Sequence, residues 1–291
     1  MRSIIVGIGE LLWDMLPGGR QLGGAPANVA RHVCSLGETG IVVSRVGADS
    51  LGRELLARFH AAGWSGEFIQ IDEVHPTGTV SVRLAADVSP SFAIREAVAW
   101  DFIECREALD SLASRAAAVC FGTLAQRSEV SRRAIGRFLH LAALATVRLL
   151  DLNLREGFYS REVVENSLRA ANAVKLNCDE LDVVRSMFSL PGDDDKVIAE
   201  LAARFELQVI ALTKGAQGSL LYADGALFTH AGFPVRVVDT VGAGDAFAAA
   251  LLVGLLRRDS PERINRFANR SAAFVCARGG ATADLSQLDM E

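Results

Sequence analysis

The sequence lacks the features that direct a protein to nucleic acid or to a membrane. No block of Lys and Arg occurs, and the formal net charge of the 291 residues is −5. Without a basic patch, or aromatic residues interleaved with cations, nucleic acid and anionic membranes are not expected partners. The longest apolar stretch, residues 246–256, is far shorter than the roughly 20 residues that span a bilayer. Because Gly9 and Glu10 interrupt the first apolar run too early for a signal peptide, we expect a cytoplasmic protein.

Cysteine is scarce and follows no pattern. The five cysteines are scattered, with no C-x-x-C pair, and most of them lie in apolar runs. This distribution favours buried, reduced thiols over a disulfide framework or a zinc site. The positions are Cys34, Cys105, Cys120, Cys178 and Cys276.

Short β-branched runs alternate with longer amphipathic runs over most of the chain. Such alternation predicts an α/β fold, a three-layer α/β/α sandwich in which helices cover both faces of a mainly parallel sheet. Helices are expected over 27–37 and 50–63, each ending on a glycine, and after Ser260 as N-cap with Pro261 at the first helical position. The expected strands are 4–8, 41–46, 118–122, 147–153, 173–177 and 208–213.

One region breaks this alternation. Residues 67–94 alternate with period two and contain no helical run, so they predict an antiparallel pair too small to have its own core. Residues 11–23, rich in Gly, could add strands to it. We therefore expect a body of residues 1–10, 24–66 and 95–291, and a small β lid of residues 11–23 and 67–94.

Polar residues and glycines follow the expected strands, at the edge of a parallel sheet where ligands usually bind. Six such clusters fall on this one edge, whereas the opposite strand ends are plain. The clusters are Glu10 with Asp14, then "TLAQR", "DLNLR", "NCDE", "TKGAQG" and "DTVGAGD".

The last cluster lies between an apolar β-type run and an apolar helical run. Gly242 and Gly244 allow close approach of the backbone to a ligand, and free N–H groups at a helix N-terminus suit an anion. No G-x-x-x-x-G-K-[ST] motif occurs, which excludes a P-loop, and Asp245 stands where such a loop places Lys. We interpret Asp245 as the group that orients and deprotonates an acceptor hydroxyl while the 242–244 amides stabilise a transferring phosphoryl group. The helix terminus would keep this carboxylate ionised; alternatively, Asp245 only caps its helix.

Several motifs resemble those of one family. "GGAPANVA", "SRVGADSLG" and "DTVGAGDAF" are similar to the N- and C-terminal signatures of the ribokinase-like sugar kinases. The resemblance extends over nearly the whole chain through "DLNLR", "KLNCDEL" and "LTKGAQGSLLY". "GELLWDMLP", "FGTLAQR" and "DLNLREGFY" point to the fructokinase branch. The resemblance implies the ribokinase-like sandwich with a small β-sheet lid.

The resemblance also implies a sugar site and a catalytic centre. Asp245 would be the catalytic base and would contact the sugar, with Gly242, Ala243 and Gly244 as an anion hole. Asp14, Gly24 and Asn28 would bind sugar hydroxyls, although Asn28 could instead be an exposed residue at a helix start. Arg155 would reach a phosphate or a substrate oxygen; an ion pair with Glu10 or Asp151 is the alternative.

The nucleotide site implied by the resemblance lies further along the chain. Asn177 and Glu180 match the N-x-x-E element that holds Mg²⁺ and phosphate through water, or else form a helix cap. Thr213 and Gly215 would line the nucleotide site, which would also use Gly242 and Gly244, and Asn269 would contact the base. Lys214 is not assigned to phosphate.

A monovalent cation such as K⁺ would lie beside the anion hole, as in many members of the family. Asp284 departs from the Ser common in relatives of the ribokinase type, which puts this cation in doubt. The matching positions are Asp239, Val241, Val275, Arg278, Gly280 and Asp284.

Together these features predict an ATP-dependent sugar kinase, fructokinase-like, that phosphorylates a primary hydroxyl of a ketose. A 2-keto-3-deoxygluconate, ribose or nucleoside kinase would share the same residues, and an acid sugar would need a cation such as Arg83 or Arg155. A non-catalytic sugar-binding regulator is the alternative of another class. The exposed face of the lid could pair with a second subunit to form a homodimer.

Overall fold

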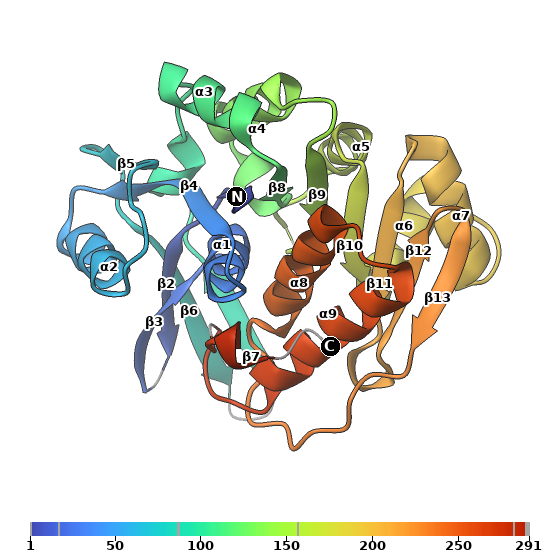
Figure 1. Cartoon of the computed structure of the whole chain (residues 1–291). Helices are drawn as coiled ribbons and strands as arrows, with labels where there is room; N and C mark the ends of the chain where they lie inside the picture. Colours follow the sequence, from blue (N-terminus) through green and yellow to red (C-terminus); the bar gives the residue numbers. More distant parts are fainter. Residues whose placement is uncertain (1, 17, 86–87, 156, 282, 289–291) are drawn as a thin grey trace.

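A nine-stranded sheet forms the centre of the protein (Figure 1). The computed structural model describes all residues except 1, 17, 86–87, 156, 282 and 289–291. The strand order is β13-β12-β11-β10-β9-β8-β1-β4-β5; the seven strands from β11 to β5 run parallel, whereas β12 pairs antiparallel with both of its neighbours. The bounds are β1 Ile4–Ile8, β4 Thr39–Gly47, β5 Ile69–Asp72, β8 Ala118–Phe121, β9 Val147–Asp151, β10 Ala173–Asn177, β11 Val209–Thr213, β12 Ser219–Ala223 and β13 Ala226–His230.

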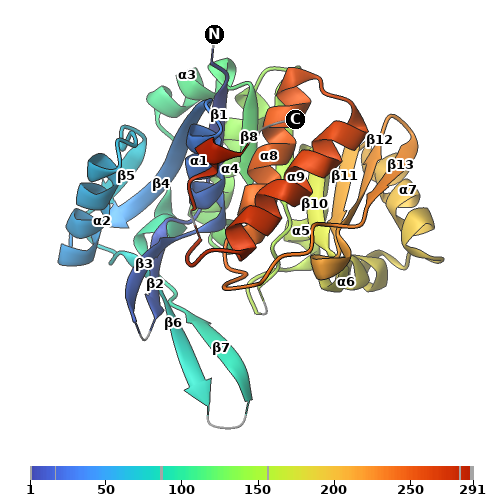
Figure 2. The same ribbon diagram turned by 60° about the horizontal axis from the view of Figure 1, so that its bottom comes forward.

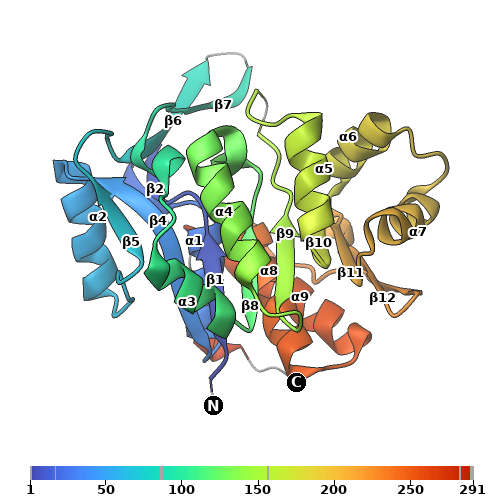
Figure 3. The same cartoon turned by 90° about the horizontal axis from the view of Figure 1, so that it is seen from above.

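Helices cover both faces of this sheet (Figure 3). Helices α1, α8 and α9 pack on one face and α3 to α7 on the other, while α2 packs beside α1 near the β5 edge. Alternate residues of β1 serve the two layers, Ile5 on the α8 side and Val6 on the α4 side. The bounds are α1 Ala25–Ser35, α2 Ser50–Ala61, α3 Glu107–Arg115, α4 Glu129–Leu141, α5 Arg161–Ala170, α6 Cys178–Phe188, α7 Asp194–Phe205, α8 Ala243–Arg257 and α9 Pro261–Cys276. The predicted sandwich is confirmed.

A second, four-stranded sheet projects from the body (Figure 2). Its order is β3-β2-β6-β7, with β2 Leu12–Leu16, β3 Gly19–Gly23, β6 Gly78–Ala85 and β7 Val88–Ile94. Residues 11–23 therefore do add strands to the antiparallel β6–β7 pair, as expected. That the sheet moves as a lid, or pairs with a second subunit, stays a prediction.

The predicted start of the lid at residue 67 is wrong for the first strand of that region. β5 pairs in parallel with β4 at the edge of the large sheet. The reason is a core contact: Ile69 is buried in a cluster with Leu55 and Phe59 of α2, which fixes β5 against the body.

The apolar run before the glycine loop was also misinterpreted, because residues 231–240 form no strand. Val237 and Val238 are 58% and 63% exposed, and the segment runs past α9, where the N–H of Val238 donates to the Cys276 carbonyl. The structure has instead the antiparallel strands β12 and β13, which are not among the expected strands. The other predicted strands are confirmed within one or two residues at each end, and Ser260 caps α9 as expected.

The cysteines differ from expectation in burial. All five are free thiols, but only Cys120 is buried, whereas Cys105 and Cys178 are exposed. Both exposed thiols lie where a helix begins or is about to begin, and not inside a strand. In the part of the chain that the structure describes, no helix has the length and apolarity needed to cross a bilayer.

Candidate active site

Asp245 lies in the first turn of α8 and faces Asn28 of α1. Its Oδ2 accepts a hydrogen bond of 2.8 Å from the Nδ2 of Asn28, a residue 217 positions earlier in the chain. The N-cap residue of α8 is Gly242, at φ 80°, and no side chain, that of Asp245 included, makes a capping hydrogen bond at this helix end. The alternative that Asp245 merely caps its helix is therefore wrong.

The amides around Gly242 are the candidates for the expected anion hole. A Cβ at Gly242 would lie 2.3 Å from the Ala281 carbonyl oxygen, so only glycine fits this left-handed turn. The first N–H groups of α8, including that of Gly244, have no partner within the helix. The N–H of Ala243, in contrast, donates to the Thr240 carbonyl at 3.3 Å, so this amide is less available to a ligand than expected.

The carboxyl of Asp245 is more basic than its position at a helix N-terminus predicted. Burial raises its pKa to about 6, and the negative charge of Asp151 adds to this effect. The hydrogen bond from Asn28 and the positive charges of Lys175 and Arg155 oppose the rise. The carboxyl is therefore still mostly ionised at neutral pH, with a pKa closer to that of an effective general base.

The expected sugar-binding residues converge from the small sheet and α1. Asp14 lies on β2, where a Cβ on Gly23 would approach its Oδ2 to 2.2 Å. Gly24 has φ 108°, and a Cβ there would lie 2.2 Å from the Glu10 carbonyl oxygen. Asn28 is only 4% exposed, so the alternative of a solvent-exposed Asn28 is wrong. Burial raises the pKa of Asp14 to about 6, against the opposing charge of Arg155.

Arg155 is exposed beside this group of acids. Its guanidinium donates to the Leu154 carbonyl at 3.3 Å. Its positive charge opposes the rise that burial causes in the pKa of Glu10 and of Asp14. Among the described residues it forms no ion pair, so the expected alternative of a pair with Glu10 or Asp151 is not found. The side chain of Arg83, the other cation considered, lies outside the described residues.

On the nucleotide side, Asn177 and Thr213 are register partners at the ends of β10 and β11. Asn177 and Glu180 form a capping box: each side chain accepts from the other residue's N–H at 2.9 Å. The second oxygen of Glu180 accepts from the Leu154 N–H, also at 2.9 Å. The helix-cap alternative is thus what the structure shows, and a role toward Mg²⁺ would come in addition to it.

The residues around Glu180 suit only a metal ion whose ligands are mainly water and phosphate. Within the described ranges, no three His, Cys, Asp or Glu side chains come together as a metal cage. Glu180 is 6% exposed, and burial raises its pKa against the charge of Lys175. Each of its oxygens keeps one lone pair beyond the backbone bonds, which fits contact with the water shell of a phosphate-bound Mg²⁺.

The two further residues expected at the nucleotide site, Thr213 and Gly215, and the unassigned Lys214 between them have different surroundings. Thr213 is partly exposed and donates to the Leu176 carbonyl at 3.4 Å, while Gly215 is exposed at φ 57°. Lys214 forms an ion pair with Asp194 at 3.1 Å, in agreement with leaving it unassigned. The surface of the sheet edge at Thr213 and Gly215 is therefore open to a ligand.

Asn269, the residue expected to contact the base, is buried inside the fold. Its side chain is 6% exposed, and its Nδ2 donates to Ser219 Oγ at 2.6 Å and to the Asn265 carbonyl at 2.8 Å. This buried network joins α9 to β12. The expected contact between Asn269 and adenine is therefore replaced by a structural role.

The residues expected around a monovalent cation separate into two places. Asp239 accepts from the N–H of Val241 at 3.0 Å and from that of Gly280 at 3.1 Å, which joins both loops beside the anion hole. Asp284 instead caps a short 3₁₀ turn through Ser286 and lines a cavity of about 570 Å³ beside α1. The remaining two expected residues are joined to each other, since the N–H of Arg278 donates to the carbonyl of the buried Val275.

Sequence reasoning missed Lys175, which lies next to Gly244 in the first turn of α8. It is 8% exposed, and its Nζ is 3.0 and 3.2 Å from the two carboxylate oxygens of Asp151. A Cβ on Gly244 would be 2.8 Å from this Nζ. A lysine inside the apolar strand "AVKLN" was the signal that could have revealed it, because an unpaired charge is rarely buried.

Two other charged residues were given no role in the site. Glu10 is 3% exposed; its Oε1 accepts from the Ala25 N–H at 3.2 Å, whereas Oε2 has no partner among the described atoms. Burial raises the pKa of Glu10 to about 7. Arg31 is buried one turn after Asn28 and donates to it at 3.2 Å. As for Lys175, the sequence signal that could have revealed Glu10 and Arg31 is a charged residue inside an otherwise apolar run.

Comparison with known proteins places this geometry in a family. Residues 18–288 match the family described as "pfkB family carbohydrate kinase". The chain belongs to the pfkB family of carbohydrate kinases. This confirms the resemblance inferred from the motifs, and the protein is a phosphotransferase that acts on sugar.

Individual relatives agree over nearly the full length. Fructokinase from Escherichia coli is 32% identical over 98% of this chain and 97% of its own, and fructokinase-1 from Zea mays is 31% identical over 98% and 95%. Among solved structures, fructokinase with bound ATP from Xylella fastidiosa has a TM-score of 0.84 at 26% identity, covering 97% of this chain and 94% of its own. The uncharacterized sugar kinase PH1459 from Pyrococcus horikoshii has a TM-score of 0.82 at 28% identity, covering 96% and 93%.

Proposed function

We propose that this sugar kinase is fructokinase-like and transfers the γ-phosphoryl group of ATP to a primary hydroxyl of a ketose. The observation that carries the proposal is the 2.8 Å contact between Asn28 and Asp245 at the amino end of α8. It joins the two signature motifs into one site, with a carboxylate beside bare helix amides. The similarity to fructokinases at 31–32% identity supports the sugar, and the ATP bound in the related fructokinase structure supports the donor.

In this mechanism Asp245 accepts the proton of the attacking hydroxyl as that oxygen forms a bond to the γ-phosphorus. The bond between this phosphorus and the bridging oxygen of ADP breaks, and ADP leaves with the electron pair. The amides of Gly242 and Gly244 would stabilise the negative charge on the transferring group. Asp14, Gly24 and Asn28 would hold the sugar, since a carboxylate and an amide can each bond to neighbouring hydroxyls.

The nucleotide would lie across the ends of β10 and β11, over Thr213 and Gly215. Mg²⁺, when bound, neutralises phosphate charge, and Glu180 with Asn177 would contact its water shell. Lys175 is buried below and adds a fixed positive charge under Gly244. A monovalent ion would use the loops that Asp239 joins. Closure of the small sheet would exclude water and limit wasteful hydrolysis of ATP.

A panel of sugars with coupled detection of ADP tests the substrate class. We expect turnover with fructose to exceed turnover with ribose, a nucleoside and 2-keto-3-deoxygluconate. Activity on 2-keto-3-deoxygluconate and none on fructose would reject the fructokinase assignment and give Arg155 the role of binding the acid. Absence of ADP release with every sugar, together with measurable sugar binding, would favour the non-catalytic regulator.

The role of the base is tested by Asp245→Asn. We expect this variant to keep sugar binding by calorimetry and to lose turnover by about 10³-fold or more, because general base catalysis and orientation act together. Asp182→Asn is the matched control: Asp182 is an acid on α6 whose side chain is 71% exposed, and it should leave turnover unchanged. Equal turnover of Asp245→Asn and the wild type would return Asp245 to a structural role.

A further inference from the structure

Arg31 is a full charge buried in the middle of α1. Its side chain is 7% exposed, and its guanidinium stacks on Trp64, with 4.2 Å between Cζ and the ring centroid. Its Nη1 donates to the Oδ1 of Asn28 at 3.2 Å. The i,i+3 spacing places both side chains on the same face of the helix, toward Asp245. An apolar side chain would fill this position without the cost of burying a charge, so the charge requires an explanation.

The donor and acceptor inventory of the three groups explains it. A guanidinium can only donate, an ionised carboxylate can only accept, and an amide has one end of each kind. Asn28 therefore has one satisfactory orientation, with Oδ1 toward Arg31 and Nδ2 toward Asp245. The flipped amide would set its amino group against the guanidinium and its carbonyl oxygen against the carboxylate. Arg31 thus excludes the second orientation.

We infer that Arg31 is a positioning residue, which fixes the Asn28 amide so that its amino end holds one oxygen of Asp245. The inference rests on the proposed function of Asp245 as the base. With Oδ2 held by Asn28, Oδ1 is the oxygen for which the described residues provide no hydrogen bond, and it is free to accept from the sugar hydroxyl. The ring of Trp64 stacks on the guanidinium and restricts its motion.

Arg31 acts on Asp245 among other charges. Its own pKa is lowered by burial and raised by the charge of Asp245, so the two groups interact electrostatically. Other charges also act on Asp245. They are Asp151 on β9, Lys175 on β10, Arg155 after β9 and the buried Glu10 after β1.

The test compares Arg31→Met with Arg31→Lys. Loss of the donor should lower kcat about tenfold, since a hydrogen bond to a charged system contributes about one factor of ten, while KM for ATP stays unchanged. In the unliganded protein, ¹³C NMR of the Asp245 carboxyl should show a higher pKa in Arg31→Met. Arg31→Lys, which keeps a charge and a donor, should recover most of both effects.

A double-mutant cycle with Asn28→Ala separates positioning from packing. If Arg31 acts through the amide, Arg31→Met should change kcat and the Asp245 titration much less in the Asn28→Ala background. An equal effect in both backgrounds would overturn the inference. The inference would also be overturned if the pKa of Asp245 in a folded Arg31→Met protein were the same as in the wild type.

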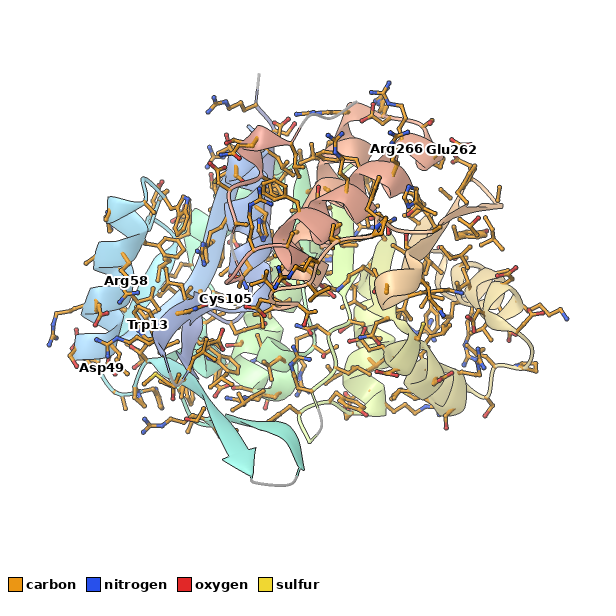
Figure 4. The ribbon with its side chains drawn as sticks, turned by 90° about the horizontal axis from the view of Figure 1, so that it is seen from below. Trp13, Asp49, Arg58, Cys105, Glu262 and Arg266 are labelled. Carbon is orange, nitrogen blue, oxygen red and sulfur yellow. The ribbon has the colours of Figure 1, made fainter. Side chains whose placement is uncertain are left out.

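Two controls exclude a simple loss of stacking. Arg58 stacks on Trp13 with 4.8 Å to the ring centroid, and its side chain is 49% exposed (Figure 4). Arg58→Met should leave kcat and the titration unchanged. Trp64→Leu removes the ring but keeps the donor, and it should reduce kcat less than Arg31→Met does; an equal loss would assign Arg31 to packing alone. The titration needs no sugar, so it reports on Arg31 even if no sugar of the panel is phosphorylated.

Discussion

The ammonium of Lys175 and the carboxylate of Asp151 form a buried pair directly under Gly244, with 3.0 Å between Nζ and Oδ1. The side chains are 10% and 3% exposed, so neither charge has water to compensate for the loss of the other. The pair links two neighbouring strands, β9 and β10, to the first turn of α8. The first turn of α8, the proposed anion hole, therefore lies over two buried charges that stabilise each other.

Lys175→Met is expected to destabilise the protein by about 3–5 kcal/mol, because it leaves Asp151 buried without a partner. Unfolding in urea, followed by circular dichroism, measures the effect. Replacing both residues, in Lys175→Met with Asp151→Leu, should be less harmful than the single change. Lys196→Met, at a lysine that is 75% exposed, is the control and should change stability little. A single change as mild as the control would show that the pair does not contribute to folding.

Gly244→Ala tests the contact from the other side of the loop. The added Cβ would lie 2.8 Å from the Lys175 ammonium, so the loop or the lysine must move. Displacing an anion-hole amide is expected to lower kcat about 10²-fold, with a smaller change in KM for the sugar. Gly136→Ala on α4 meets nothing within 4 Å and is the matched control, with full activity expected. Full activity of Gly244→Ala as well would remove its amide from the proposed mechanism.

The parallel sheet could be predicted because its strands are buried on both faces and read as apolar runs, such as 173–177. The exposed valines at 235, 237 and 238 belong to a run of similar composition that forms no strand, and composition alone cannot tell the two apart. β5 was assigned to the wrong sheet because its partner, β4, is fixed by the tertiary packing of Ile69. The local sequence pattern of a strand does not determine which distant strand it pairs with.

The site residues that belong to a signature motif could be predicted from the sequence. The buried charged residues whose partners lie on other strands or helices could not. Asp245 and Asn28 lie in signature motifs, and the structure joins them. Lys175 and Arg31 lie in apolar runs, where their partners become evident only when strands and helices are assembled. Asn269 shows the opposite failure, since a polar residue near the expected base is engaged in a network inside the fold.

The pH dependence of kcat/KM is expected to follow Asp245. Its pKa is raised to about 6, so kcat/KM should fall tenfold per pH unit below about pH 6, where the base is protonated, and should level off above it. Glu10, with a pKa raised to about 7, and Asp14, with a pKa raised to about 6, are the competing explanations. The limb near pH 6 should persist in Glu10→Gln and in Asp14→Asn; if it disappears in one of these variants, that residue is the group that the profile reports.

Glu10→Gln should also change stability in a direction set by its pKa. Burial raises the pKa of Glu10 from 4.5 to about 7, so the unfolded chain releases its proton at lower pH than the folded protein. The cost of burying the carboxylate is absent below about pH 4.5, grows as the pH rises to 7, and is constant above that. Glu10→Gln should thus be more stable than the wild type at pH 8 by up to about 3 kcal/mol, with little difference at pH 4.5. Equal stability at both pH values would contradict the raised pKa.

Cys178 provides a test of where the nucleotide binds that does not depend on turnover. This exposed thiol opens α6 after Asn177, and its Sγ lies 3.8 Å from the Thr213 carbonyl oxygen. A nucleotide over the ends of β10 and β11 would cover it. With Mg·ATP at ten times its dissociation constant, alkylation of Cys178 should slow about tenfold, as measured by mass spectrometry of the peptides. The exposed Cys105, labelled in Figure 4, should react at the same rate with and without nucleotide. Equal slowing of both thiols would indicate a general tightening of the protein, and unchanged alkylation of Cys178 would place the nucleotide elsewhere.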